Sequence, residues 1–260
     1  MSDASPVLVD QDSGIGMIRL NRPDKFNCLS MDVMRRMAAA LDGFEADASI
    51  RVVLIASEGK QFCTGADLQE VDGLRDSRSA LAEFIATGHA TLCRLEASPL
   101  PIVAAVQGLA LAGGLELMMA CDIAFAASSA KFGDQHSQFG LIPGWGGSQR
   151  LPRLIGMRRA MDLFFSAAWI DANTAKEWGL VNRVAKDNAL RNDTLAYCRT
   201  LAERSRSGLA IMKRLARQGI DLPLTEALQL EQNIAPDALM SPDVSEGLAA
   251  FEGRRKPNFA

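Results

Sequence analysis

Short strand-like runs that alternate with glycine turns and apolar helical segments constrain the fold of this chain most strongly. Residues 51–56 and 102–107 are rich in β-branched and small apolar side chains, a composition typical of strands. The second run leads through a Gly-Gly pair into an apolar segment at 115–120, and residues 122–127 again have strand character. This repeated order of strand, turn and helix predicts an α/β fold.

The two flanks of this central pattern predict a hairpin at the start and helices at the end. Residues 7–10 and 17–20 lie on either side of a Ser-Gly-containing turn, which predicts a β-hairpin. Ser30 is a typical N-cap for the long helical pattern that follows it. Beyond Pro143 helical patterns dominate. The expected helices cover residues 159–167, 172–178, 188–204, 207–218 and 224–240, and an earlier helix ends near Ala97, before Pro99 and Pro101.

Composition and charge exclude several classes of partner. The chain has 260 residues, of which 48% are hydrophobic and 23% charged, so it can bury a substantial core as one large or two smaller domains. Its net charge of -3, without a basic stripe, does not indicate nucleic-acid binding. Five dispersed cysteines and two histidines favour a reducing compartment over disulfides or a zinc site. Because no leader-like start and no membrane-length apolar run are present, we expect a cytoplasmic protein without a membrane partner.

Two segments have the features of an oxyanion hole, a pair of amide donors that stabilises a developing negative charge. Residues 61–67 and 111–116 each end a strand-like run, where backbone N–H groups are expected to be exposed. Glycines in the second segment permit close approach of a ligand, and the apolar run after them places their amides at a helix N-terminus. Fixed amide dipoles of this kind stabilise the negative charge that develops on the oxygen of a thioester as it becomes an enolate.

Glu116 lies in the first turn of the helix that follows the second segment. A glutamate at this place can be explained by its favourable interaction with the helix dipole alone. Its neighbours Leu115, Leu117, Met118 and Met119 nevertheless predict a buried position, and a buried carboxylate requires a reason. We therefore interpret Glu116 as a catalytic candidate.

Five motifs occur along the chain: NRPDKFNCL at 21–29, FCTGAD at 62–67, GGLEL at 113–117, CDIA at 121–124 and GLIPGWGGSQRL at 140–151. In order and spacing they resemble the enoyl-CoA hydratase/isomerase (crotonase) superfamily, and the resemblance extends to residues 251–259. It implies a crotonase-like spiral of ββα repeats over 1–200 that carries the acyl-CoA site, followed by a helical trimerisation region over 201–260. It also implies an acyl-CoA substrate, no cofactor beyond the coenzyme A of that substrate, and a homotrimer or a dimer of trimers.

Residue by residue, the resemblance implies that the N–H groups of Ala66 and Gly113 hold the thioester oxygen and that Gly144 helps to position water or substrate. Glu116 matches one of the two glutamates of a hydratase, and His136 occupies the place of the second. Histidine can act as an acid or a base near neutral pH, although a structural histidine with satisfied hydrogen bonds is the competing interpretation. We therefore expect Glu116 to activate water, while His136 orients it or handles the proton at the α-carbon.

The resemblance also implies contacts to coenzyme A from Lys25, Ala66, Asp67 and Leu68, and from Lys256 of a neighbouring subunit. Two of these residues have simpler explanations, because Asp67 is a typical helix cap and Lys25 a typical solvated lysine. The glycines at 144–147 do not complete a dinucleotide fingerprint, and no Walker-type motif occurs, so NAD and ATP sites are not indicated.

Three classes of function follow. The first is an enoyl-CoA hydratase-like lyase, favoured because both oxyanion segments and Glu116 are intact. The second is another reaction of the superfamily, either isomerisation of a double bond or hydrolysis of a thioester or C–C bond with His136. The absence of the second glutamate, whose place His136 takes, weakens the isomerase interpretation. Trp145 weakens the C–C hydrolase interpretation, because C–C hydrolases of this superfamily place a carboxylate at its position. The third is a non-catalytic binding or assembly protein, and the acidic net charge disfavours its RNA-binding form.

Overall fold

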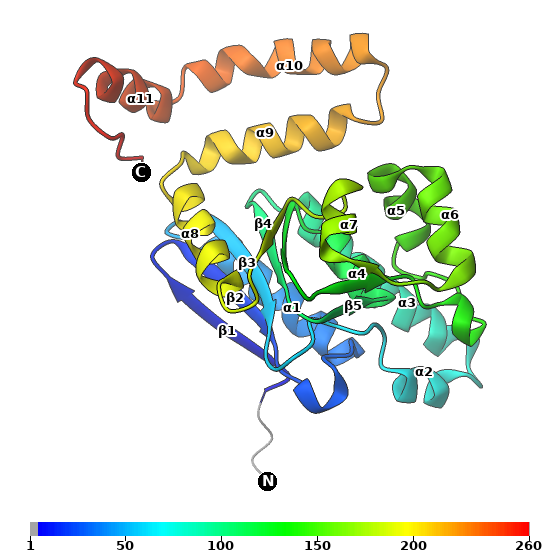
Figure 1. Cartoon of the computed structure of the whole chain (residues 1–260). Helices are drawn as coiled ribbons and strands as arrows, with labels where there is room; N and C mark the ends of the chain where they lie inside the picture. The colour runs from blue at the N-terminus through cyan, green and yellow to red at the C-terminus, as the bar shows by residue number, and fades with distance from the viewer. Residues whose placement is uncertain (1–4, 260) are drawn as a thin grey trace.

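The computed structural model describes residues 5–259 and contains a large and a small β-sheet surrounded by helices (Figure 1). The large sheet has the strand order β1-β2-β3-β4-β6-β9. β1 and β2 form the predicted antiparallel hairpin, and the other pairs of this sheet are parallel, so the predicted α/β class is confirmed. The strands are β1 (Val7–Asp12), β2 (Ile15–Leu20), β3 (Val52–Ser57), β4 (Ile102–Val106), β6 (Ile123–Ala127) and β9 (Arg183–Ala185).

The small sheet brings the two oxyanion segments together. It has the order β5-β7-β8, with β5 (Leu109–Leu111), β7 (Lys131–Gly133) and β8 (Ile170–Asp171). Cys63 joins its edge, because the Cys63 N–H donates to the Leu109 carbonyl at 3.0 Å and the Leu111 N–H donates to the Cys63 carbonyl at 3.0 Å. The chain after Cys63 therefore runs beside the chain that leads into α4.

Helices cover both sheets. α1 begins after Ser30, whose hydroxyl accepts a hydrogen bond from the Val33 N–H, as the N-cap prediction requires. α8 packs on the strands β2, β3, β4 and β6, whereas α1 packs on β1, β2 and α3. Every residue of α4 is buried. The helices of this main body are α1 (Met31–Ala46), α2 (Leu68–Leu74), α3 (Arg78–Ala97), α4 (Gly113–Met119), α5 (Gly147–Ile155), α6 (Met157–Ser166), α7 (Ala172–Glu177) and α8 (Leu190–Ala202), with short 3₁₀ helices at Pro23–Lys25 and Ser137–Phe139.

Several short elements were not predicted. The strands β5, β7, β8 and β9 have two or three residues each, too few to show a periodicity. α5 begins at a glycine and contains Pro152, both of which have poor helix propensity, so its motif was interpreted only as a backbone turn. α2 was also not predicted, because its polar residues show no sustained apolar periodicity. The predicted helices correspond, with shifts of a few residues at their ends, to α3, α4 and α6 to α10.

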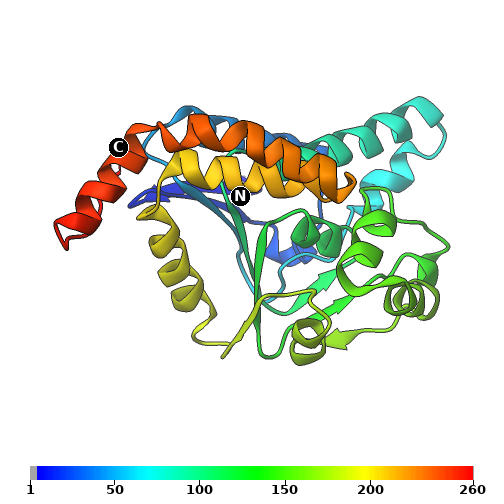
Figure 2. The same cartoon turned by 90° about the horizontal axis from the view of Figure 1, so that it is seen from above.

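The last three helices form a C-terminal arm that extends beyond the main body: α9 (Arg206–Gly219), α10 (Leu224–Leu239) and α11 (Pro242–Glu252) (Figures 1 and 2). α9 and α10 run side by side, and neither has a buried residue along its described length. Ile220, Leu224, Leu228, Met240 and Phe251 are mostly exposed. Exposed apolar surface of this kind marks a protein interaction site and agrees with the expected self-association, which remains a prediction together with the domain division. Among residues 5–259, no helix combines the length and the apolar composition needed to cross a membrane.

Candidate active site

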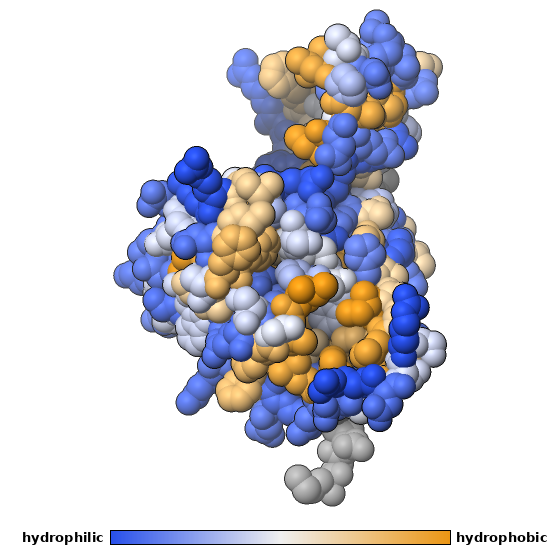
Figure 3. Space-filling model, turned by 90° about the vertical axis from the view of Figure 1, so that its right-hand side faces the viewer, coloured by the Kyte–Doolittle hydropathy of each residue, from blue (hydrophilic) through white to orange (hydrophobic). Residues whose placement is uncertain are grey.

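One cavity of about 650 Å³ contains eight of the nine residues that the sequence predicted to form the site. Its walls come from the two oxyanion segments, from α2 and α3, and from the segment between β7 and α5. Figure 3 shows hydrophobic side chains around a hollow on this side of the main body. The predicted residues in the cavity wall are Lys25, Ala66, Asp67, Leu68, Gly113, Glu116, His136 and Gly144.

The Ala66 and Gly113 amides lie next to each other at the inner wall. A Cβ atom added to Gly113 would lie 3.3 Å from the Ala66 nitrogen, and one added to Gly65 would lie 3.2 Å from the Gly113 nitrogen. Within residues 5–259, neither of these two N–H groups donates to a backbone or side-chain acceptor. Two adjacent free amides that border a cavity have the arrangement expected for the donor pair of an oxyanion hole.

An unusual backbone conformation aims the Gly113 amide. Ala112 has φ 47° and ψ -120°, a region that non-glycine residues rarely adopt. It is held there by hydrogen bonds on both sides, because its N–H donates to the Gly133 carbonyl at 3.0 Å and its carbonyl accepts from the Glu116 N–H at 3.0 Å. Gly114 is required for close packing, since an added Cβ atom would lie 2.1 Å from the Cys63 carbonyl oxygen. The strand edge thus fixes the donor on α4.

Glu116 projects from α4 into the same cavity and is almost fully buried, with 1% of its surface exposed. Its Oε1 accepts hydrogen bonds from the Trp145 N–H at 2.9 Å and the Gly147 N–H at 2.7 Å. Burial raises the pKa of this carboxyl above its ordinary value, although the two amides and His136 act against that rise. Oε1 is therefore held by two amides, whereas neither of these amides donates to Oε2.

His136 faces the second oxygen of Glu116. Its Nε2 lies 4.0 Å from Glu116 Oε2, beyond hydrogen-bond distance but close enough for one small molecule to bridge the two groups. On its other side, Nδ1 lies 2.9 and 3.0 Å from the two oxygens of Asp134, which is itself buried. Burial lowers the pKa of His136, but the hydrogen bond and charge of Asp134, with the charge of Glu116, raise it overall above its ordinary value.

Asp134 is a buried partner of His136 that the sequence did not predict. It orients His136 by accepting a hydrogen bond from the Nδ1 N–H, so that Nε2 faces Glu116. Its backbone position also matters, because the His136 N–H donates to Asp134 Oδ1 at 3.2 Å. The available signal was an acidic residue two positions before a candidate catalytic histidine. The amides of Trp145 and Gly147 were likewise missed as partners of Glu116.

The remaining predicted residues lie around the mouth of the cavity. Asp67 caps α2 by accepting from the Gln69 N–H at 3.2 Å and pairs with Arg22 at 2.8 Å, so the simpler explanation of this residue is confirmed. Lys25 is half exposed, and its Nζ donates to the Gln69 side chain at 3.2 Å. Leu68 is also half exposed. Gly144 lies against α3, where an added Cβ atom would contact an Ile85 methyl carbon at 2.7 Å.

Lys256 lies apart from this cavity within its own chain. Its Nζ is 3.7 Å from a Glu203 oxygen, and its side chain is almost fully exposed at the end of the arm. The prediction placed Lys256 against the substrate of a neighbouring subunit, and it stays a prediction.

Apolar side chains form much of the cavity wall. α3 contributes Leu81, Phe84 and Ile85 to the cavity wall, and Trp169 also contributes, whereas Phe164 lines a neighbouring cavity. The Trp145 indole packs on Phe84, with ring centres 5.5 Å apart. It also fills the space left by two glycines, because a Cβ atom on Gly88 or Gly113 would lie 2.3 or 2.6 Å from it.

The fold, the paired amides and the buried carboxylate define a member of the crotonase class, and comparison with known proteins places the chain in its family. Residues 10–260 match the model of the enoyl-CoA hydratase/isomerase family, so the chain belongs to that family. It is 38% identical over 253 residues to the probable enoyl-CoA hydratase echA8 of Mycobacterium bovis, with 97% of both chains covered. It is 36% identical to the mitochondrial methylglutaconyl-CoA hydratase of Homo sapiens, covering 97% of this chain and 75% of that protein. The crystal structure of enoyl-CoA hydratase from Bacillus anthracis superposes with a TM-score of 0.94 at 34% identity, covering 98% of each chain.

Proposed function

We propose that the protein is an enoyl-CoA hydratase-like lyase that adds water across the 2,3 double bond of an acyl-CoA thioester. The observation that carries this proposal is the joint placement of two free amides and the Glu116 carboxylate on one cavity wall. The relatives named as hydratases agree with this reaction.

In the first step, the thioester oxygen accepts hydrogen bonds from the Ala66 and Gly113 amides. As water adds to the β-carbon, electrons move through the double bond onto this oxygen and form an enolate. The two amides are already oriented, so they stabilise the negative charge without reorganisation, and loss of one such donor costs about 3 kcal/mol.

Glu116 acts as the base for the attacking water. Its Oε1 is fixed by two amides, so Oε2 is the oxygen that takes the proton. A pKa raised by burial makes this carboxylate a stronger base than an exposed glutamate. Gly144, which borders the same space without a side chain, leaves room for water and substrate.

His136 supplies the proton that the α-carbon requires. Asp134 accepts a hydrogen bond from Nδ1, and the protonated imidazole donates its Nε2 proton to the α-carbon of the enolate. A C–H bond forms, and the thioester carbonyl is restored. The proton that Glu116 took from water then passes to the neutral His136, whose Nε2 lies 4.0 Å from Glu116 Oε2. Both groups return to their starting states, and the net change is the addition of one water molecule.

Coenzyme A carries the substrate, and the polar mouth of the cavity is its proposed binding region. Lys25 supplies a positive charge there, next to the segment of Ala66, Asp67 and Leu68. Lys256 of a neighbouring copy completes this part of the proposal, within a homotrimer or a dimer of trimers whose contacts involve the arm.

The assay follows the loss of conjugated absorbance when purified protein is mixed with crotonyl-CoA and longer 2-enoyl-CoA thioesters. Formation of the 3-hydroxyacyl-CoA, identified by mass spectrometry, is the expected result. Conversion of a 3-enoyl-CoA without hydration of any 2-enoyl-CoA would replace the proposal with an isomerase.

The Asp134–His136 pair favours one second candidate, hydrolysis of an acyl-CoA. A carboxylate that orients a histidine is the arrangement by which hydrolases activate a nucleophile. Hydrolysis of the thioester releases a free thiol, whereas hydration does not. A thiol-reactive dye added to the same reactions therefore separates the two candidates.

A further inference from the structure

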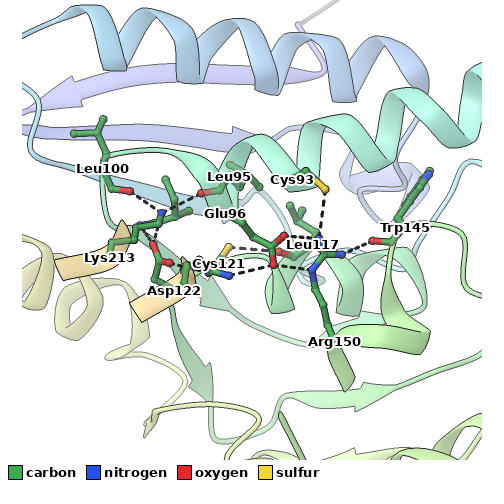
Figure 4. A network of polar contacts seen from close by, with 12 residues as sticks. Cys93, Leu95, Glu96, Leu100, Leu117, Cys121, Asp122, Trp145, Arg150 and Lys213 are labelled. Atoms are coloured by element: carbon green, nitrogen blue, oxygen red, sulfur yellow. Dashed lines mark hydrogen bonds and ion pairs between the residues drawn. The ribbon is translucent and has the colours of Figure 1, made fainter. Parts of the chain in front are cut away.

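A network of charged side chains lies directly behind the turn that holds Glu116. Arg150, in α5, forms a bidentate pair with Glu96 of α3 at 2.8 and 2.6 Å. The same guanidinium donates to the Trp145 carbonyl, as Figure 4 shows. Arg150 thus connects α3 to the turn between the cavity and α5.

The contact to Trp145 is significant because this residue is held from two sides. Its N–H donates to Glu116 Oε1, and its carbonyl accepts from Arg150. Gly146, the next residue, has φ 99°, and a Cβ atom there would lie 2.1 Å from the Arg150 Nη1. Gly147 then gives the second N–H to Glu116. The guanidinium therefore packs onto the short turn that presents both amides.

We propose that Arg150 is a positioning residue for Glu116. By fixing the 145–147 turn, it keeps both amides on Oε1 and so leaves Oε2 directed at His136. This inference rests on the proposed role of Glu116 as the catalytic base.

The same network reaches the C-terminal arm. Arg217 of α9 pairs with Glu96 at 3.2 Å and with Asp122 at 2.8 Å, and Lys213 pairs with Asp122 at 2.7 Å. Lys213 also donates to the carbonyls of Leu95 and Leu100, at 3.0 Å each. The Glu96 carboxylate thus pairs both with Arg217 of the arm and with Arg150, which contacts the 145–147 turn. The docking of the arm and the geometry of Glu116 therefore depend on the same carboxylate.

Loss of the guanidinium has a defined expected effect on the base. When the turn loosens, Glu116 loses part of the hydrogen bonding that favours its charged form, so its pKa rises further above its ordinary value. A misplaced base also slows the chemical step while the coenzyme A contacts at the cavity mouth remain. A purely structural arginine would lower stability and leave both properties unchanged.

The test compares the full-length wild type with Arg150→Met, Arg150→Lys and the double variant Arg150→Met with Glu96→Met. The double variant removes both members of the partly buried pair and avoids an unpaired carboxylate if the single variant does not fold. Arg94→Met is the matched control, because Arg94 also lies on α3 but pairs with Asp42 and Glu45 of α1 and not with the 145–147 turn.

Two readouts are measured. In steady-state hydration, we expect kcat to fall on the order of 10- to 100-fold in Arg150→Met and in the double variant, as for other displaced catalytic groups, with KM little changed. Arg150→Lys should recover part of this loss, and Arg94→Met should match the wild type. In protein labelled with ¹⁵N-glycine, the pH titration of the Gly147 amide signal reports ionisation of Glu116, and its midpoint should move to higher pH.

The outcomes separate this inference from the proposed function. A folded Arg150→Met variant with wild-type kcat and an unshifted Gly147 midpoint would overturn the positioning role, even if the hydratase proposal stands. If the wild type hydrates no enoyl-CoA, the proposed function fails, and the Gly147 midpoint still decides whether Arg150 controls the Glu116 carboxyl.

Discussion

The two walls of the cavity are built in different ways. The oxyanion wall consists of backbone amides, which a strand edge and the start of α4 place next to each other. The acid–base wall consists of side chains, in which Glu116, His136 and Asp134 come from α4 and from the segment after β7. One wall is therefore fixed by the hydrogen bonding of the fold, and the other depends on which side chains occupy a few positions.

This difference indicates which part of the cavity can vary between reactions. An amide donor needs only the correct backbone course, so the oxyanion wall can serve any reaction that passes through an enolate. The acid–base wall decides which proton moves and where. A histidine with an aspartate partner, in place of a second glutamate, changes that wall while the first wall stays intact.

The largest expected effect is the loss of the base. In Glu116→Gln the side chain keeps its shape and can still accept the Trp145 and Gly147 amides, but it can no longer take a proton from water. We expect kcat to fall on the order of 10³-fold or more, within the range for general acid–base residues. Calorimetric titration with the 3-hydroxyacyl-CoA product should show nearly unchanged affinity for that thioester. Unchanged turnover would remove Glu116 from the mechanism.

The oxyanion wall is tested by Gly114→Ala. The added methyl would lie 2.1 Å from the Cys63 carbonyl oxygen, so the two segments that hold the donors must move apart. We expect kcat to fall on the order of 10²-fold, as for removal of one donor. Thermal unfolding should show a loss of about 1–3 kcal/mol, typical of overpacking. Gly73→Ala is the control, because nothing lies within 4 Å of an added Cβ atom there.

Removal of the histidine tests the acid–base wall. We expect His136→Gln to lower kcat on the order of 10²-fold, since one proton-transfer partner is lost. On the proposed mechanism, wild-type activity requires ionised Glu116 and protonated His136, and the pKa of each lies above its ordinary value. The rate should therefore decline at low pH as Glu116 is protonated and at high pH as His136 loses its proton. The high-pH decline should be absent in the variant, and near-wild-type kinetics would make His136 structural.

The sequence predicted the oxyanion wall better than the acid–base wall, for a physical reason. The resemblance to the crotonase superfamily implied Ala66 and Gly113 as the donors, and a glycine pair between a strand and an apolar helix, which permits close approach of a ligand, supports the same prediction. Side-chain partners depend on loop geometry, which has no periodicity. Only its place two positions before His136 therefore distinguished Asp134 from a surface aspartate, although it is 2% exposed.

The fold shows the same contrast. Long elements such as α1, α3 and α10 were predicted because their apolar periodicity is sustained over many residues. α5 and the strands of the small sheet were missed. Of these elements, β5 contributes Leu109 and Leu111 to the cavity wall, and the turn before α5 contributes Gly144 and Trp145. The 145–147 turn, where Arg150 and Glu116 meet the same residue, could not be predicted from a glycine-rich motif alone.

A smaller effect is expected from Asp134→Asn. The Asp134 charge raises the pKa of His136, so its removal should move the high-pH decline of activity to lower pH. The same charge opposes ionisation of Glu116, so the low-pH decline should move in the same direction. The pH–rate profile measures both limbs. Asp171→Asn removes the charge of an exposed aspartate and keeps a side chain that can cap α7, so it should leave the profile in place. An unshifted profile for Asp134→Asn would separate Asp134 from the chemistry.

The smallest expected effect concerns the mouth of the cavity, where neither wall takes part. Lys25 is half exposed, so a contact from its ammonium to a phosphate of coenzyme A is screened by water and worth about 1 kcal/mol or less. We expect Lys25→Met to raise KM by less than about fivefold at unchanged kcat, and only for substrates with the complete coenzyme. The same acyl group on pantetheine, which lacks the nucleotide, should give equal KM values for both proteins. An equal increase for both substrates would show that Lys25 acts through the shape of the cavity mouth, by its contact with Gln69, and not through charge.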